Sequence, residues 1–106
     1  MTVVVLDAPE AGAIDLPVAH GTDDPGTADA VIVFAENRAR LSRRTDLFRD
    51  AALRDALAWL AYPKGGRLGT DLNRESVAEL LSGRGIRPVR QVAIDEVWSA
   101  LRFRPA

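Results

Sequence analysis

The stretch that decides the fold lies near the end of the chain, at residues 89–103, and reads VRQVAIDEVWSALRF. Both of its halves have the composition of β-strands, and only Asp95-Glu96 separates them, which predicts an antiparallel hairpin. The strands are expected at Val89–Ile94 and Val97–Phe103. If the turn holds just those two residues, Ile94 lies opposite Val97, and this pairing fixes which side chains share a face.

This register divides the hairpin into two faces. One face is apolar and is expected to join the core: Val92, Ile94, Val97, Leu101 and Phe103. The other face holds Arg87, Val89, Gln91, Ala93, Trp98, Ala100, Arg102 and Arg104. Because Trp and Arg anchor many interfaces, we predict a partner-binding surface made by Arg87, Trp98, Arg102 and Arg104. The alternative is that a helix covers Trp98 while the guanidinium groups reach solvent. Either way, Trp98 is expected to be mostly buried.

Earlier in the chain, three continuous apolar runs are typical of strands buried on both faces. They are Val3–Leu6, Ala30–Phe34 and Leu57–Tyr62. A further short strand is expected at Val18–His20, before a turn cluster at residues 21–26. The sequence therefore predicts a mainly β framework with connections long enough for helices.

Two of those connections have helical character. From Asn37 to Asp55 apolar residues recur at helical spacing, with an interruption expected near Ser42–Thr45. A second helix is expected to begin after Asp71 or Asn73 as its N-cap and to run to about Ser82, followed by Gly83 or Gly85 in the left-handed conformation.

Strands that alternate with helices and end in an antiparallel pair predict one α/β domain over residues 1–106. The expected architecture is a Rossmann-like, mainly parallel sheet ending in an antiparallel hairpin. A helix ending in Gly, then Ile86-Arg87-Pro88 and two strands, resembles the end of class I S-adenosylmethionine-dependent methyltransferase sheets. That resemblance implies a shortened methyltransferase-like domain.

A narrower resemblance rests on three segments. They are Trp59–Lys64 (WLAYPK), Thr70–Arg74 (TDLNR) and Gly85–Pro105 (GIRPVRQVAIDEVWSALRFRP). Together they resemble bacterial domain-of-unknown-function family 3052, whose members carry YPK…TDL…RPVRQVA(I/V)D…WSALRFRP. The resemblance covers residues 57–105 closely and residues 1–36 in outline. The family has no established activity, so the resemblance implies membership and no function.

The loop after the first strand, Asp7–Gly12, bears on whether the methyltransferase cofactor is expected. Cofactor loops of this kind are rich in glycine, which lets the backbone approach the ligand. Here the loop has one glycine and Pro9. Asp23 or Asp24 is placed to hold ribose hydroxyls, yet both lie in a turn cluster where Asp is common. We therefore expect no S-adenosylmethionine binding and no other cofactor.

The loop at residues 64–71 is the best candidate for a ligand site. It follows a strand and precedes a helix, where free backbone N–H groups and the helix dipole favour anions. Lys64, Arg67, Thr70 and Asp71 are the predicted anion-binding residues. Ordinary turn chemistry is the alternative, with Asp71 capping the helix and occupying the anion position itself.

Charge and composition narrow the remaining classes. Residues 1–37 hold seven acidic residues and no Lys or Arg, whereas residues 62–106 hold eight basic and five acidic residues. This polarity suits either an anionic ligand or head-to-tail pairing of two copies. With net charge −1 and no motif, nucleic acid is not expected as a partner. Cysteine is absent and His20 is the single histidine, so no metal site is expected.

The sequence has no apolar run long enough for a membrane span and no signal peptide pattern, so a cytoplasmic protein without membrane partners is expected. No nucleophile elbow or adjacent base is present, and no catalytic residue is assigned. We therefore predict a non-catalytic binding or regulatory module that forms homo-oligomers. The alternative is a small enzyme or ligand sensor that binds a nucleotide-like or carboxylate anion at residues 64–71.

Overall fold

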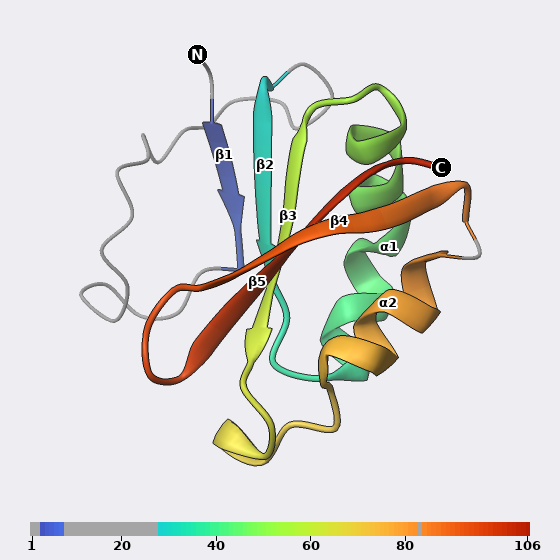
Figure 1. The fold of residues 1–106 in the computed structure, drawn as a ribbon. Helices are drawn as coiled ribbons and strands as arrows, with labels where there is room; N and C mark the ends of the chain where they lie inside the picture. Colours follow the sequence, from blue (N-terminus) through green and yellow to red (C-terminus); the bar gives the residue numbers. More distant parts are fainter. Residues whose placement is uncertain (1–2, 8–27, 83) are drawn as a thin grey trace.

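The computed structural model describes residues 3–7, 28–82 and 84–106, and Figure 1 shows their arrangement. The strands are β1 (Val3–Leu6), β2 (Ala30–Phe34), β3 (Leu57–Pro63), β4 (Ile86–Ala93) and β5 (Trp98–Pro105). The helices are α1 (Arg38–Leu53) and α2 (Arg74–Ser82), with a short 3-10 helix, η1 (Arg67–Gly69), before α2. The elements predicted within these ranges are confirmed, with small differences at their ends. The predicted strand Val18–His20, the loop at residues 8–12, Asp23, Asp24 and Gly83 lie outside the described residues.

The sheet has the strand order β1-β2-β3-β5-β4. The pairs β1–β2 and β2–β3 are parallel, whereas β3–β5 and β4–β5 are antiparallel. The prediction of a Rossmann-like, mainly parallel sheet is therefore wrong, and the shortened methyltransferase-like description is wrong with it. The chain is an α/β domain with a mixed sheet.

The order of the strands explains this difference. β1, β2 and β3 are added in one direction, so their order lacks the reversal that creates the binding crevice of a doubly wound sheet. Chain connections between parallel strands are right-handed, which fixes the side of the sheet on which α1 lies. Within the described residues, both helices pack on that same face, as Figure 1 also shows.

The two faces of the sheet carry separate apolar clusters, because side chains alternate along each strand. On the helix-covered face, sheet residues Val31, Val33, Leu60, Leu101 and Phe103 pack with helix residues Leu41, Phe48, Val77 and Leu81. On the opposite face, Phe34, Ala61, Trp98 and Ala100 are buried, with Val5, Ile32, Trp59, Val92, Ile94 and Val97 partly buried around them. Within the described part of the chain, no helix residue belongs to this second cluster.

Helix α1 runs without the interruption expected near Ser42–Thr45. It begins after Asn37, whose side-chain oxygen accepts the backbone N–H of Arg40 at 2.9 Å and so caps the first turn. Inside the helix, the hydroxyl of Thr45 donates to the carbonyl of Leu41 at 2.9 Å. Because this bond satisfies the hydroxyl within the helix, Thr45 does not start a second segment.

The hairpin turn is longer than predicted, and the register differs by one residue. Ile94 lies opposite Trp98 instead of Val97, since its backbone N–H donates to the Trp98 carbonyl at 3.0 Å. The cause is Asp95, whose carboxylate accepts the backbone N–H groups of Val97 and Trp98, each at 2.7 Å. These bonds hold Val97 in the turn. The predicted division of the hairpin faces is therefore wrong: Val92 and Ile94 share a face with Trp98, opposite to Leu101 and Phe103.

Strand β4 lies at one edge of the sheet and contains a bulge. Pro88 pairs with Phe103 and Arg90 with Arg102, so Val89 is an extra residue without an opposite partner. The bulge shifts the register back by one residue, so Arg87 pairs with Arg104, the pairing that a two-residue turn would give.

Neither helix in the described ranges combines the length and the apolar character needed to span a membrane.

Candidate functional site

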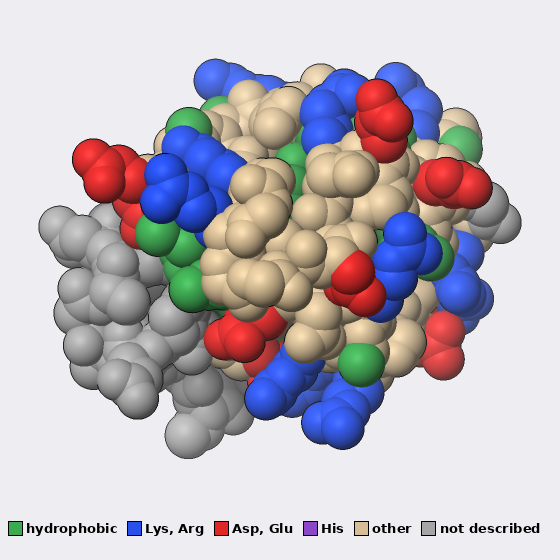
Figure 2. Space-filling model, turned by 90° about the horizontal axis from the view of Figure 1, so that it is seen from below, with side chains coloured by type: hydrophobic (Ala, Val, Ile, Leu, Met, Phe, Trp, Pro, Cys, Tyr) green, Lys and Arg blue, Asp and Glu red, His purple; other side chains and the backbone are tan. Residues whose placement is uncertain are grey.

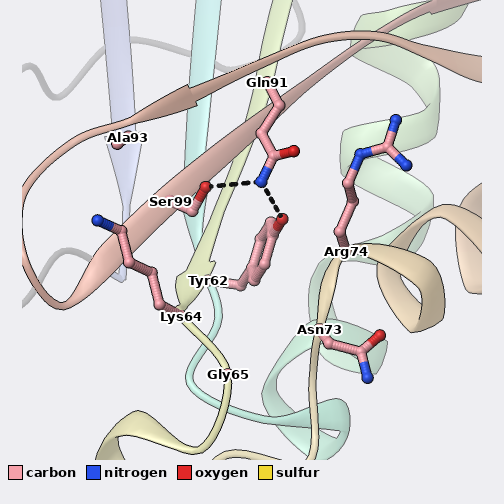
Figure 3. A pocket seen from close by; sticks show the side chains of 8 residues that line it. All are labelled: Tyr62, Lys64, Gly65, Asn73, Arg74, Gln91, Ala93 and Ser99. Atoms are coloured by element: carbon pink, nitrogen blue, oxygen red, sulfur yellow. Dashed lines mark hydrogen bonds between the residues drawn. The ribbon is translucent and has the colours of Figure 1, made fainter.

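A pocket of about 440 Å³ opens where β3 ends, between the hairpin and the start of α2. It is lined by Tyr62, Lys64, Gly65, Asn73, Arg74, Gln91, Ala93 and Ser99. These residues come from four places in the chain: the end of β3, the loop after it, the first turn of α2, and the two strands of the hairpin (Figure 3). Its volume falls in the range typical of small-molecule sites.

The wall between the strands is a hydrogen-bonded group of three side chains. The Nε2 of Gln91 donates to the hydroxyl oxygens of Tyr62 at 3.3 Å and Ser99 at 3.2 Å. The hydroxyl of Ser99 in turn donates to the backbone carbonyl of Val92 at 3.2 Å. Tyr62 and Ser99 face each other across the β3–β5 pair and are both buried. This side of the pocket is therefore a fixed polar surface.

Two cationic side chains stand on either side of that surface. Figure 3 shows Lys64 beside the hairpin and Arg74 beside α2, with Tyr62 and Gln91 between them. Within the described ranges, neither Lys64 nor Arg74 has an ion-pair partner. Lys64 is held at its backbone, where its N–H donates to the carbonyl of Val97 at 2.7 Å. The pocket thus combines two uncompensated positive charges with polar hydrogen-bonding groups.

The first turn of α2 is closed by its own residues. The side-chain oxygen of Asn73 accepts the backbone N–H of Ser76 at 2.8 Å, and the Ser76 hydroxyl accepts the backbone N–H of Asn73 at 2.9 Å. This reciprocal arrangement identifies Asn73 as the N-cap, one of the two alternatives left open by the sequence. The pocket's attraction for anions therefore rests mainly on Lys64 and Arg74.

Burial raises the pKa of Tyr62 above its usual 10.0, while a hydrogen bond with Ser99 and the positive charge of Arg74 act in the opposite direction. Desolvation disfavours the phenolate and so has the largest effect. Tyr62 is therefore neutral at physiological pH and keeps its hydroxyl proton.

The four residues predicted for the anion site do not gather at one place. Lys64 lines the pocket, whereas Arg67, Thr70 and Asp71 are not among its lining residues. Arg67 is exposed in η1, and the Thr70 hydroxyl accepts the backbone N–H of Leu72 at 3.0 Å. Asp71 does not cap α2.

Asp71 instead serves the first turn of α1. Its side-chain oxygen accepts the backbone N–H of Arg38 at 2.9 Å, and its carbonyl accepts from the Arg38 side chain at 3.4 Å. This contact joins the loop before α2 to the start of α1. Asp71 therefore does not occupy the N-terminal end of α2. The alternative to ligand binding, in which Asp71 caps α2, is wrong.

The predicted partner surface divides into a buried and an exposed part. Trp98 is 4% exposed, which confirms its predicted burial, and its ring meets that of Phe34 edge to face at 5.2 Å. Arg87 and Arg104 are exposed and directly opposite each other, and Arg102 lies opposite Arg90. Of these, Arg104 is paired with Asp55 through two bonds of 3.0 Å.

Sequence reasoning missed most of the pocket. Tyr62 was assigned to the core, and Gln91 to the face of Trp98. Asn73 was considered only as a cap, and Arg74 and Ser99 were not singled out. The signal that pointed to the site was the position of Lys64-Gly65 after a strand end. The other residues depend on the hairpin register, which the sequence did not supply.

Seen from the end where β3 finishes, Lys and Arg side chains occur at several separated places, with Asp and Glu side chains between them (Figure 2). The described surface in this view has no continuous basic stripe of the kind that follows a nucleic-acid backbone. No protein-family model matches the chain, and no curated protein is significantly similar to it. The resemblance to domain-of-unknown-function family 3052 stays a prediction.

Proposed function

We propose that the protein is a non-catalytic binding module that takes a small anionic ligand in the pocket beside Tyr62. The observation that supports this most strongly is the placement of Lys64 and Arg74 on two sides of one pocket, without ion-pair partners in the described ranges. A phosphate or carboxylate group between them would form charge-assisted hydrogen bonds with both. The cytoplasmic location expected from the sequence remains part of this proposal.

The neighbouring groups support an anion and not a cation. The described residues that line the pocket include no carboxylate, and Asp71, in the loop before α2, is engaged with α1. Tyr62 keeps its proton because burial raises its pKa, so the phenol adds a donor and no negative charge. The lining therefore offers positive charge and hydrogen-bond donors to a ligand that carries negative charge.

The proposal is tested by titrating ¹⁵N-labelled protein with propyl phosphate, a simple monoester, and following amide chemical shifts. We expect shifts concentrated at the end of β3, the first turn of α2 and Ser99. Arg74→Gln should weaken binding about tenfold or more, as expected for a lost hydrogen bond between charged groups. Arg43→Gln, an exposed arginine of α1 that does not line the pocket, is the matched control. Shifts scattered over the surface, or an equal effect of both variants, would reject the proposal.

A second candidate function, association between copies of the chain, is favoured by the arginines of the hairpin. The pair Arg90–Arg102 places like charges directly opposite each other, which is unfavourable unless anions compensate, whereas Arg104, opposite Arg87, is already compensated by Asp55. Residues 1–37 of a second copy, with seven acidic residues and no basic ones, supply such charge. Sedimentation velocity at low and high salt tests this. A monomer at low salt and high protein concentration would exclude it.

A further inference from the structure

The loop between β3 and α2 begins and ends at the pocket. Gly65, near its start, and Asn73, at its end, both line the cavity, and η1 lies between them. Figure 3 shows these two residues on the two arms of the loop. Because three residues of extended chain span at most about 11 Å, Leu68 lies within that distance of Gly65. The whole middle of the loop is therefore within reach of the pocket.

The two ends of this loop are fixed, whereas its middle is not. At the first end, the backbone N–H of Lys64 donates to the carbonyl of Val97 at 2.7 Å. At the other end, Leu72 is 2% exposed and belongs to the core on the helix side of the sheet. Residues 65–69 between these ends are all exposed, and a side chain built on any of their three glycines would meet no described atom within 4 Å. This middle part can change conformation without disturbing the core.

Leu68, in the middle of the loop, combines two features that are rarely found together. Its side chain is 59% exposed, and its backbone lies in the left-handed region, at φ 54° and ψ 23°. A single exposed leucine is ordinary, but a leucine in this region carries a steric penalty. The other described non-glycine residues with positive φ are Asp7 and Asp55, a residue type that tolerates this conformation, and each is paired with an arginine. Leu68 has no polar group to compensate the penalty.

From this combination we infer that residues 65–69 are a lid, which closes over a ligand in the pocket and places Leu68 on the ligand's apolar part. Closure takes the backbone of Leu68 out of the left-handed region and its side chain out of water, so both changes favour the closed form. An apolar group on the ligand provides the surface that this side chain lacks in the open form, and so shifts the loop towards closure. The inference rests on the proposed function and specifies its ligand as a small anion that carries an apolar group.

The test compares propyl phosphate with inorganic phosphate, which has no apolar group for the lid to cover. In the whole ¹⁵N-labelled protein, saturation with propyl phosphate should slow amide exchange with water at residues 66–69 about tenfold, as for a loop that is closed in about 90% of the molecules. Inorganic phosphate should leave this exchange unchanged.

Leu68→Gly removes both the strain and the apolar side chain, since glycine adopts the left-handed conformation freely. The variant should bind propyl phosphate about 5- to 30-fold more weakly, the factor that corresponds to the left-handed penalty of one residue. Its affinity for inorganic phosphate should not change, and its urea midpoint should be unchanged or higher. Leu53→Gly, the same change at an exposed leucine at the end of α1 that does not line the pocket, is the matched control and should leave both affinities as they are.

The outcomes separate the two proposals. If neither anion binds, the proposed function itself is wrong, and the lid falls with it. If propyl phosphate binds but exchange at residues 66–69 does not slow, or Leu68→Gly binds it as tightly as the unchanged protein, the anion site stands and the lid is overturned. Equal weakening of both anions in Leu68→Gly would also overturn it, because this would show a disturbed site and not a lost cover. A lower urea midpoint of this variant would contradict the strained open loop.

Discussion

Replacing Trp98 with alanine removes the largest buried side chain of the cluster on the sheet face away from the helices. The side chain is 4% exposed and lies 5.2 Å from the ring of Phe34, at an interplanar angle of 78°. Substitutions of this kind in a core cost about 3–5 kcal/mol, from lost apolar burial and the cavity left behind. The edge-to-face pair contributes about 0.5–1.5 kcal/mol of this beyond its burial. A domain of this size has a total stability of about 5–15 kcal/mol, so the loss is a large fraction of it.

Urea unfolding followed by far-ultraviolet circular dichroism measures the effect, since the signal does not depend on the tryptophan that is removed. The midpoint should fall strongly in Trp98→Ala at an unchanged slope. Trp59→Ala is the matched control, because Trp59 lies on the same face but is only partly buried and should cost less. A double-mutant cycle with Phe34→Leu should recover the coupling of the two rings. A cost below about 1 kcal/mol for Trp98→Ala, a value typical of surface positions, would refute the burial on which this reasoning depends.

Three further predictions concern charge, capping and the pocket. The hydrogen bond with Arg44 lowers the pKa of Asp7 below its usual 3.8, so the pair adds stability that is complete above about pH 4 and is lost as pH falls through the lower folded pKa. Arg44→Met should flatten acid unfolding in this range and cost no more than about 1 kcal/mol at pH 7, because the pair is partly exposed. Asp71→Ala should lower the urea midpoint by about 1 kcal/mol through the lost cap on α1, without weakening propyl phosphate binding. Tyr62 is the single tyrosine, so an ultraviolet pH titration reports its pKa alone; it should lie above 10.0, and Arg74→Gln should raise it further.

The strands and helices could be predicted because each follows from a local pattern of apolar and polar residues. The apolar runs at Val3–Leu6 and Ala30–Phe34 lie in the structure at the residues expected, and the amphipathic stretch after Asn37 forms α1. How the strands order themselves was not predictable in this way. The same series of elements suits a doubly wound sheet or a mixed one, and the order of β1, β2 and β3 together with the pairing of β3 with β5 distinguishes them.

The site could be predicted only in part, since it depends on register. A two-residue turn places Gln91 on the face of Trp98, whereas the bonds of Asp95 to the turn backbone shift the pairing and turn Gln91 towards Tyr62. The hydrogen bonds of Asp95 at the hairpin tip thus decide which hairpin residues line the pocket. Lys64, predicted as an anion-binding residue, lines the pocket, because its position follows from the end of β3 alone.

The bulge at Val89 and the neighbouring Pro88 have a consequence for growth of the sheet. An edge strand with regular free N–H and C=O groups is a template on which another chain can add, and this is how ordered aggregates begin. Along β4, Pro88 has no N–H to offer, the bulge interrupts the spacing, and Arg87 and Arg90 bring charge to the same stretch. An incoming strand would meet a gap, a kink and two guanidinium groups within four residues. The hairpin therefore ends the sheet on this side and protects the chain against edge-to-edge polymerisation.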